Sequence, residues 1–83
     1  MAASRQEISE WFENGLKGKH NYMLVVCDTF DWDDYPVFAD TGEECIKIND
    51  NPGEMQKVME VYNLKEDKES QMNERRCFRL PKP

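Results

Sequence analysis

The 83-residue chain has few of the residues that build metal centres and covalent catalytic sites: one histidine and three cysteines. A structural zinc site needs about four soft ligands at short spacings, and none of those spacings occurs among His20, Cys27, Cys45 and Cys77. An odd number of cysteines without close pairing also argues against a disulfide framework. The sequence therefore predicts no zinc site, no Cys–His catalysis and no cofactor.

Long apolar runs are missing as well. No segment approaches the roughly 18 apolar residues that a membrane-spanning helix needs, and residues 1–7 lack the apolar core of a signal peptide. We therefore expect a cytoplasmic protein that has no membrane partner. A chain of 83 residues makes one small domain, and such a domain buries only about 60–65% of its unfolded surface.

Basic residues are scarce in most of the chain. Residues 1–64 carry five Lys/Arg and thirteen Asp/Glu, a net charge of −8, whereas residues 65–83 carry six and four, a net charge of +2. An acidic body repels a phosphate backbone, so nucleic-acid binding is disfavoured. The same acidity predicts that the partner is another protein with a basic surface.

A first helix is predicted from Ser4 to Gly15. Ser4 followed three residues later by Glu7 is a capping box. Four apolar residues then recur at helical spacing and form one stripe: Ile8, Trp11, Phe12 and Leu16. Gly15 and Gly18 mark the expected end of this helix.

A second helix is predicted from Pro52 to Asn63. Asn51 can cap it, Pro52 suits its first position, and Glu54 completes a capping box. Apolar residues follow at i, i+3, i+4 and i+7, as in a helix that covers a core: Met55, Val58, Met59 and Tyr62. After a charged linker over residues 65–69, a short helix that carries Met72 is predicted over residues 70–76.

Strands are predicted before and after a polar loop. Residues 22–27 are rich in β-branched and aromatic side chains and apolar on both faces, which is typical of a central strand covered on both sides. Residues 36–39 predict a second strand, in which Pro36 suits an edge. Residues 44–49 fit a third short strand or one helical turn, and we favour the strand.

These elements predict an α+β fold: a small two-layer sandwich in which an antiparallel sheet of two to three strands is covered by two helices on one face. Residues 1–64 form the single domain of this prediction. Residues 65–83 form a linker and a C-terminal arm that packs on it. The second apolar face of the central strand needs a cover, from this arm or from a second copy of the chain in a homodimer.

The segment between the two predicted strands is the main functional candidate. Within eight residues it places four aspartates and three large aromatics, where a solvated turn would more often carry Gly, Asn and Ser. They are Asp28, Phe30, Asp31, Trp32, Asp33, Asp34 and Tyr35. Loops carry function more often than cores do, so this is where a site is expected.

Two interpretations of this loop assign it neither catalysis nor metal binding. In the first, Asp28 and Asp31 order the turn by bonding backbone amides, and the aromatics fold onto the core. In the second, the loop binds a partner protein, and the protein is a non-enzymatic binding or regulatory module. Trp32 and Tyr35 are then the aromatic anchors, and a basic partner is selected by three carboxylates: Asp31, Asp33 and Asp34.

The alternative function is a small divalent-metal-dependent hydrolase or transferase that uses Asp28 and Asp31. Asp28 ends the predicted central strand, where many α/β enzymes hold such a carboxylate. The D-x-x-D spacing differs, however, from the D-x-D of haloacid-dehalogenase-type phosphotransferases. This loop also lacks the Gly and the Glu that the EF-hand template requires. No Gly-rich phosphate loop follows. Mimicry of nucleic-acid charge would need a stripe of carboxylates rather than one loop.

Three segments also carry a resemblance. They are residues 25–37 (VVCDTFDWDDYPV), 55–64 (MQKVMEVYNL) and 71–76 (QMNERR). Together they resemble a family of short, uncharacterised proteins of bacteria and bacteriophages, over most of the chain from about Tyr22 onward. The resemblance implies a cytosolic bacterial or phage protein, and it transfers no catalytic residue.

Overall fold

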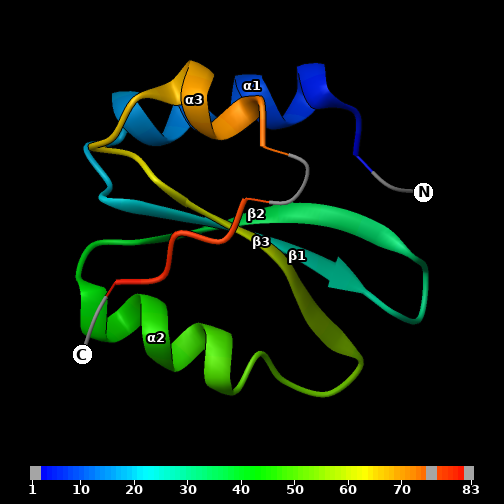
Figure 1. The fold of residues 1–83 in the computed structure, drawn as a ribbon. Helices are drawn as coiled ribbons and strands as arrows, with labels where there is room; N and C mark the ends of the chain where they lie inside the picture. The colour runs from blue at the N-terminus through cyan, green and yellow to red at the C-terminus, as the bar shows by residue number, and fades with distance from the viewer. Residues whose placement is uncertain (1–2, 75–76, 82–83) are drawn as a thin grey trace.

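The computed structural model describes residues 3–74 and 77–81, which contain three helices and three strands. In chain order these are α1 (Arg5–Lys17), β1 (Tyr22–Asp28), β2 (Asp33–Ala39), α2 (Gly42–Asp50), β3 (Gln56–Asn63) and α3 (Lys68–Met72). The strands form one antiparallel sheet in the order β2-β1-β3. This arrangement, shown in Figure 1, confirms the predicted small α+β fold with β1 at the centre of its sheet.

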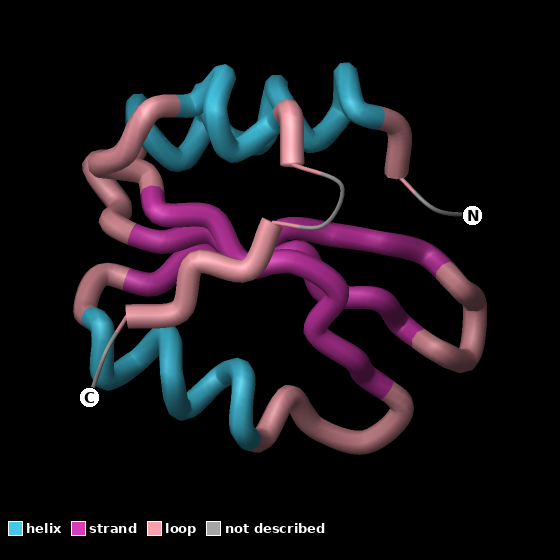
Figure 2. Tube along the Cα trace, viewed as in Figure 1, coloured by secondary structure: helices cyan, strands magenta, loops and turns pink. Residues whose placement is uncertain are grey.

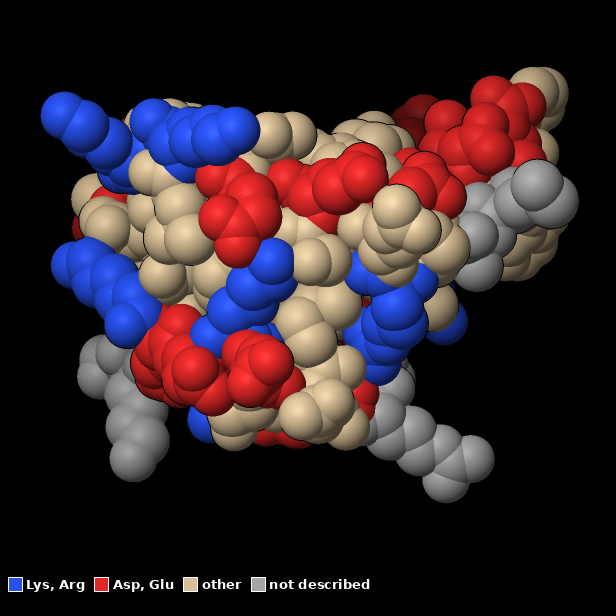
Figure 3. Space-filling view, turned by 90° about the horizontal axis from the view of Figure 1, so that it is seen from above, with Lys and Arg blue, Asp and Glu red and all other residues tan. Residues whose placement is uncertain are grey.

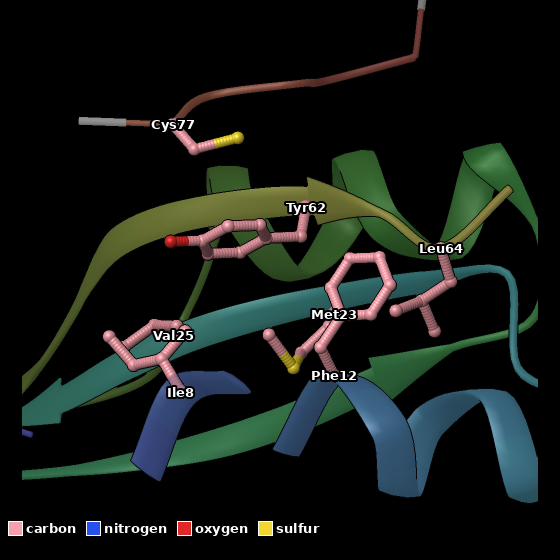
Figure 4. Packing of buried hydrophobic residues seen from close by; sticks show 7 residues of the cluster. All are labelled: Ile8, Phe12, Met23, Val25, Tyr62, Leu64 and Cys77. Carbon is pink, nitrogen blue, oxygen red and sulfur yellow. The ribbon is translucent and has the colours of Figure 1, made fainter. Parts of the chain in front are cut away.

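Helices lie on both faces of the sheet: α1 and α3 on one and α2 on the other (Figures 1 and 2). On the α1 side, Met23 and Val25 of β1 pack with buried residues of α1 and β3, as Figure 4 shows. On the α2 side, Leu24 and Val26 pack with Cys45 of α2. Alternate residues of β1 therefore face two separate clusters, which is why this strand is apolar throughout.

The second face of β1 is covered within the chain. Leu24 and Val26 are almost fully buried there, and Leu80 of the C-terminal segment packs against the same cluster. The main cover is α2, a helix in the segment for which the sequence favours a strand over a helical turn. The prediction that the helices over residues 4–15 and 52–63 cover one face of the sheet is therefore wrong. Helices cover both faces instead.

The start of α1 matches its prediction, and of the two glycines expected at its end only Gly18, the C-cap, is found there. Ser4 is the N-cap, and both halves of the capping box with Glu7 are formed. The helix runs two residues past Gly15 to Lys17. Gly15 is buried, and a Cβ there would lie 2.8 Å from side-chain atoms of both Leu64 and Phe38. Gly15 therefore allows close approach of α1 to the sheet rather than ending the helix.

The predicted strand over residues 44–49 is wrong, because these residues belong to α2. Thr41 is the N-cap, and its Oγ1 accepts a hydrogen bond from the backbone N–H of Glu44 at 3.1 Å. Thr41 and Glu44 have the spacing of a capping box, so the sequence did carry a helix signal here.

The predicted helix over residues 52–63 is also wrong. Asn51 caps the C-terminus of α2 by donating from its backbone N–H to Lys47 O at 3.0 Å. Pro52 follows this cap, a common position for proline because it cannot continue the helix. Asn51 and Pro52, which predict the start of a new helix, therefore mark the end of α2 instead.

The helical spacing within β3 comes from a β-bulge. Val58 pairs with Val26, and Glu60 pairs with Val25, so the intervening Met59 has no partner on β1. The extra residue shifts the alternation of the strand by one. Val58 and Val61 consequently face the α2-side cluster, and Met59 and Tyr62 face the α1-side cluster. The members of each pair are three residues apart, as they would be on one face of a helix.

The C-terminal part returns to the outer edge of β3. Asp67 caps α3, which is shorter than the helix predicted over residues 70–76 and begins earlier; residues 75 and 76 lie outside the described part of the chain. Val61 donates to Cys77 O at 3.0 Å, and Arg79 donates to Val61 O at 2.9 Å. Residues 77–79 thus give β3 a short parallel neighbour. None of the helices in residues 3–74 and 77–81 is long and apolar enough to cross a membrane.

Candidate partner-binding site at the β1–β2 end of the sheet

A four-residue loop, residues 29–32, joins β1 to β2, and Asp28 organises it. Asp28 pairs across the hairpin with Asp33. Its Oδ1 accepts a hydrogen bond from Phe30 N at 2.9 Å, and its carbonyl oxygen accepts one from Trp32 N at 2.6 Å. Aspartate side chains commonly fix turns in this way. Part of the turn-ordering interpretation is therefore observed for Asp28.

The connection between α2 and β3 reaches the same end of the sheet. The backbone N–H of Thr29 donates to Met55 O at 2.7 Å, so the two loops are bonded to each other. Both loops hold a non-glycine residue in the left-handed region: Trp32 has φ 60° and Met55 has φ 57°. Such a conformation costs on the order of 1–3 kcal/mol and is found most often at functional sites.

Three large apolar side chains project from these loops into solvent. Their exposed fractions are 71% for Phe30, 64% for Trp32 and 56% for Met55. Among the described residues only two other large hydrophobic side chains are exposed, Leu16 and Phe78. Single exposed apolar residues are ordinary, but three in two bonded loops form a group. We call Phe30, Trp32 and Met55 the tip patch.

Carboxylates surround the tip patch. Residues 28–34 and 53–57 contain five acidic residues and one basic residue, Lys57, for a net charge of −4. Asp31, Asp33 and Glu54 are exposed. Figure 3 shows acidic side chains gathered at the end where β1 and β2 join in Figure 1, while both signs of charge mix elsewhere on that face. Within the described residues, neither Asp31 nor Glu54 takes part in an ion pair.

The structure divides the five predicted partner-binding residues into two groups. Asp31, Trp32 and Asp33 are exposed at the tip. Asp34 and Tyr35 are only half-exposed and are tied to the fold. Asp34 Oδ2 accepts a hydrogen bond from Ala3 N at 3.0 Å, and Tyr35 packs against the α2-side cluster.

Two members of the tip patch, Phe30 and Met55, were not among the predicted binding residues. Met55 belongs to the apolar stripe of the predicted helix over residues 52–63, which is expected to face the core, so the sequence gives no sign of its exposure. Phe30 lies in the predicted loop, but nothing in its sequence context distinguishes an exposed aromatic from one that folds onto the core. The signal that joins Met55 to this loop is a backbone hydrogen bond, which has no sequence signature.

The carboxylates predicted for the metal-dependent alternative are not part of a larger ligand set. In residues 3–74 and 77–81, no three His, Cys, Asp or Glu side chains converge in a way that could hold a metal ion. One oxygen of Asp28 is already engaged with Phe30 N. The structure therefore adds no ligand to the pair Asp28 and Asp31.

The cysteines and the histidine lie in surroundings that disfavour nucleophilic chemistry. All three cysteines are buried and free. Burial raises the pKa of the Cys45 thiol to about 11 and that of Cys77 to about 12. Burial, followed by the proximity of Asp34, also raises the pKa of Cys27. His20 stacks on Phe38 and bonds to Asp40 through Nδ1 at 2.7 Å, near the start of β1 rather than at the tip.

The chain matches no protein-family model, and no curated protein or solved structure matches it. The resemblance to short bacterial and phage proteins stays a prediction. The geometry and charge of the tip are therefore the basis for inferring a function.

Proposed function

We propose that the protein is a non-enzymatic binding module that docks a basic segment of another protein on the tip patch. The observation that carries this proposal is the gathering of Phe30, Trp32 and Met55 at the surface, within an acidic rim. Aromatic residues and methionine are enriched at the centres of protein interfaces. Tryptophan is among the residues that contribute most to binding when a partner covers it.

Exposure of the patch favours binding over a purely structural role. Phe30 and Trp32 would each stabilise the fold by roughly 1.5–3 kcal/mol if they were buried. Both are instead mostly in water, and Trp32 sits in a costly backbone conformation. A partner that covers Phe30 and Trp32 would gain the free energy of burying these side chains, which folding alone does not provide.

The loops that carry the patch are held in place before any partner arrives. Backbone N–H groups of Thr29, Phe30 and Trp32 are each hydrogen-bonded within the tip. Binding to an ordered loop loses less conformational entropy than binding to a mobile one. The observed turn order at Asp28 therefore supports the binding interpretation as well.

Charge indicates the kind of partner. The net charge of −4 at the tip attracts a basic surface and accelerates its encounter. It also repels acidic partners and nucleic acid. Asp31 and Glu54 have no ion pair within the described residues. A cation of a partner therefore need not displace a Lys or Arg of these residues from either carboxylate.

The test is selection of a random-peptide display library on the immobilised protein, with counterselection on the double variant Phe30→Ala/Trp32→Ala. We expect the enriched peptides to carry net positive charge and to lose binding to the double variant. Leu16→Ala is the matched control, because it removes an exposed apolar side chain near the opposite end of the sheet. Enrichment of acidic peptides, or equal binding to native protein and double variant, would contradict the proposal.

A further inference from the structure

We infer that the group recognised by the tip patch is an arginine side chain, so that the partner segment is rich in arginine rather than merely cationic. This inference rests on the proposed function and names the chemistry of its partner. Its basis is the order of exposed side chains along the loop and the first residue of β2: Phe30, Asp31, Trp32 and Asp33 alternate aromatic ring and carboxylate.

A guanidinium can use both kinds of group at once. Its plane stacks on an aromatic ring, and its N–H groups in that plane donate to a carboxylate, often in pairs. An ammonium is a compact, strongly hydrated point charge that gains from the carboxylate but matches neither the stacking nor the fork geometry. Rings that alternate with carboxylates therefore discriminate between two side chains of equal charge.

The two rings are accessible enough for stacking. Phe30 is 71% exposed and Trp32 is 64% exposed, and tryptophan is the best of the aromatic residues for cation–π contact. The loop that holds them is fixed by the bonds from Phe30 N and Trp32 N to Asp28. A partner can therefore reach the exposed part of each side chain without first reorganising this connection.

The carboxylate of Asp31, the residue between the two aromatics in the sequence, is also available, unlike many acidic groups elsewhere in the molecule. Glu13 is paired with Lys68, Glu60 with Arg5, and Glu66 and Glu74 with Arg79. Asp31 is exposed and has no such partner among the described residues. Within the part of the chain that the structure describes, no cation pairs with Asp31, and an arginine from a partner would supply one.

The experiment compares two synthetic peptides of equal length and charge, one repeating Gly-Arg-Ser and the other repeating Gly-Lys-Ser. Binding is followed through Trp32 fluorescence in a Trp11→Phe protein, where Trp32 is the only indole. We expect the arginine peptide to bind at least about threefold more tightly, because a guanidinium stacks flat on an aromatic ring and donates to a carboxylate in pairs, and an ammonium lacks this geometry. Equal affinities for the two peptides would overturn the inference and leave docking of a basic segment standing.

Two variants separate the contributions of ring and carboxylate, and both are measured by calorimetry. Trp32→Leu keeps an apolar side chain but removes the aromatic face, so it is expected to abolish the preference for arginine while lysine binding is retained. Asp31→Asn keeps the shape and removes the charge, so both peptides weaken. Preserved arginine preference in Trp32→Leu would overturn the inference, provided circular dichroism shows the native fold.

A second copy of the chain is the competing occupant, and sedimentation velocity of the protein alone tests for it. We expect a monomer at the concentrations used for binding. A dimer that Trp32→Ala dissociates would overturn the arginine assignment. If the library selection gives no tip-dependent peptide, the proposed function fails too; if it selects basic peptides without arginine, only the present inference fails.

Discussion

The side-chain amide of Gln71 pairs with both backbone groups of Asn63. Gln71 Oε1 accepts from Asn63 N at 2.7 Å, and Nε2 donates to Asn63 O at 2.8 Å. Nε2 also donates to Asp67 O at 3.1 Å, and the side chain is 1% exposed. Gln71 therefore takes the place of a neighbouring strand at the end of β3, and it fixes α3 to the sheet with every side-chain group satisfied.

Replacing Gln71 with methionine tests this relationship. Methionine has a similar length and apolar stem but can neither accept from Asn63 N nor donate to Asn63 O. We expect a loss of about 2–3 kcal/mol in the free energy of unfolding, because buried backbone groups are left unpaired. Urea titration measures it. Gln56→Met, the same change at an exposed position of β3, should stay within about 0.5 kcal/mol of native, and equal losses in both variants would refute the pairing role.

The end of α1 provides a second prediction, an increase in stability. Lys19 follows the C-cap Gly18 and has φ 60°. Lys19 N donates to Leu16 O and His20 N to Gly15 O, the two bonds of a Schellman motif. Glycine is the usual residue at this left-handed position because an L side chain costs roughly 1–2 kcal/mol there. Lys19→Gly should therefore stabilise the protein by about 0.5 kcal/mol after the entropic cost of glycine.

The control for this prediction is the same substitution two residues earlier. Lys17 is the last residue of α1, in helical conformation, so Lys17→Gly gains no relief and should lose up to about 1 kcal/mol. Thermal unfolding of both variants gives opposite signs if the strain at Lys19 is real. If Lys19→Gly instead destabilised the protein, the left-handed conformation of Lys19 would not cost the folded state the free energy assumed here.

The buried thiols predict how stability changes at alkaline pH. The pKa of Cys45 is raised from its ordinary value of 9.0 to about 11 by burial. A raised folded-state pKa stabilises the protein fully below pH 9, and this stabilisation is lost as the pH rises from 9 towards 11. The expected slope for this thiol is about 1.4 kcal/mol per pH unit in that window.

Cys45→Ala isolates this contribution. The variant is expected to be less stable than the native protein at pH 8, because a buried side chain is shortened. Its free energy of unfolding should nevertheless fall less steeply between pH 9 and 11. Other groups titrate in both proteins alike, so chemical denaturation at several pH values gives the difference directly. Parallel pH profiles would mean that Cys45 ionises as readily in the folded as in the unfolded protein.

The elements that could be predicted are those whose signals are local. The capping box of Ser4 with Glu7 and the strand predicted over residues 22–27 are confirmed, and β1 extends one residue further to Asp28. A capping box and a strand that is apolar on both faces depend on nearby residues alone. The strand prediction over residues 44–49 overlooked a local helix signal, Thr41 with Glu44. The helix prediction over residues 52–63 is wrong because a long-range feature decides that segment. The bulge at Met59 makes a strand repeat with the spacing of a helix, and that bulge exists only against β1.

The candidate site was predictable in part for the same reason. The density of aromatics and carboxylates in residues 28–35 is visible in the sequence, and it points to the connection between β1 and β2. The loop itself is shorter than predicted, residues 29–32, because β2 already begins at Asp33. Which aromatics reach solvent depends on the register of the hairpin, which places Tyr35 opposite Val26 and against the core. Met55 joins the site only through the packing of a second connection.

The last prediction separates the two interpretations of the loop by stability alone. If Phe30 and Trp32 held the fold together, each change to alanine would cost about 3–5 kcal/mol, as for buried aromatics. Because both side chains are mostly exposed, we expect each variant to stay within about 0.5 kcal/mol of the native free energy of unfolding. Thr41→Ala, which removes the N-cap of α2, should cost about 1 kcal/mol and shows that the urea titration resolves such changes. Large losses at Phe30 or Trp32 would assign the aromatics to the fold and leave the tip without its binding role.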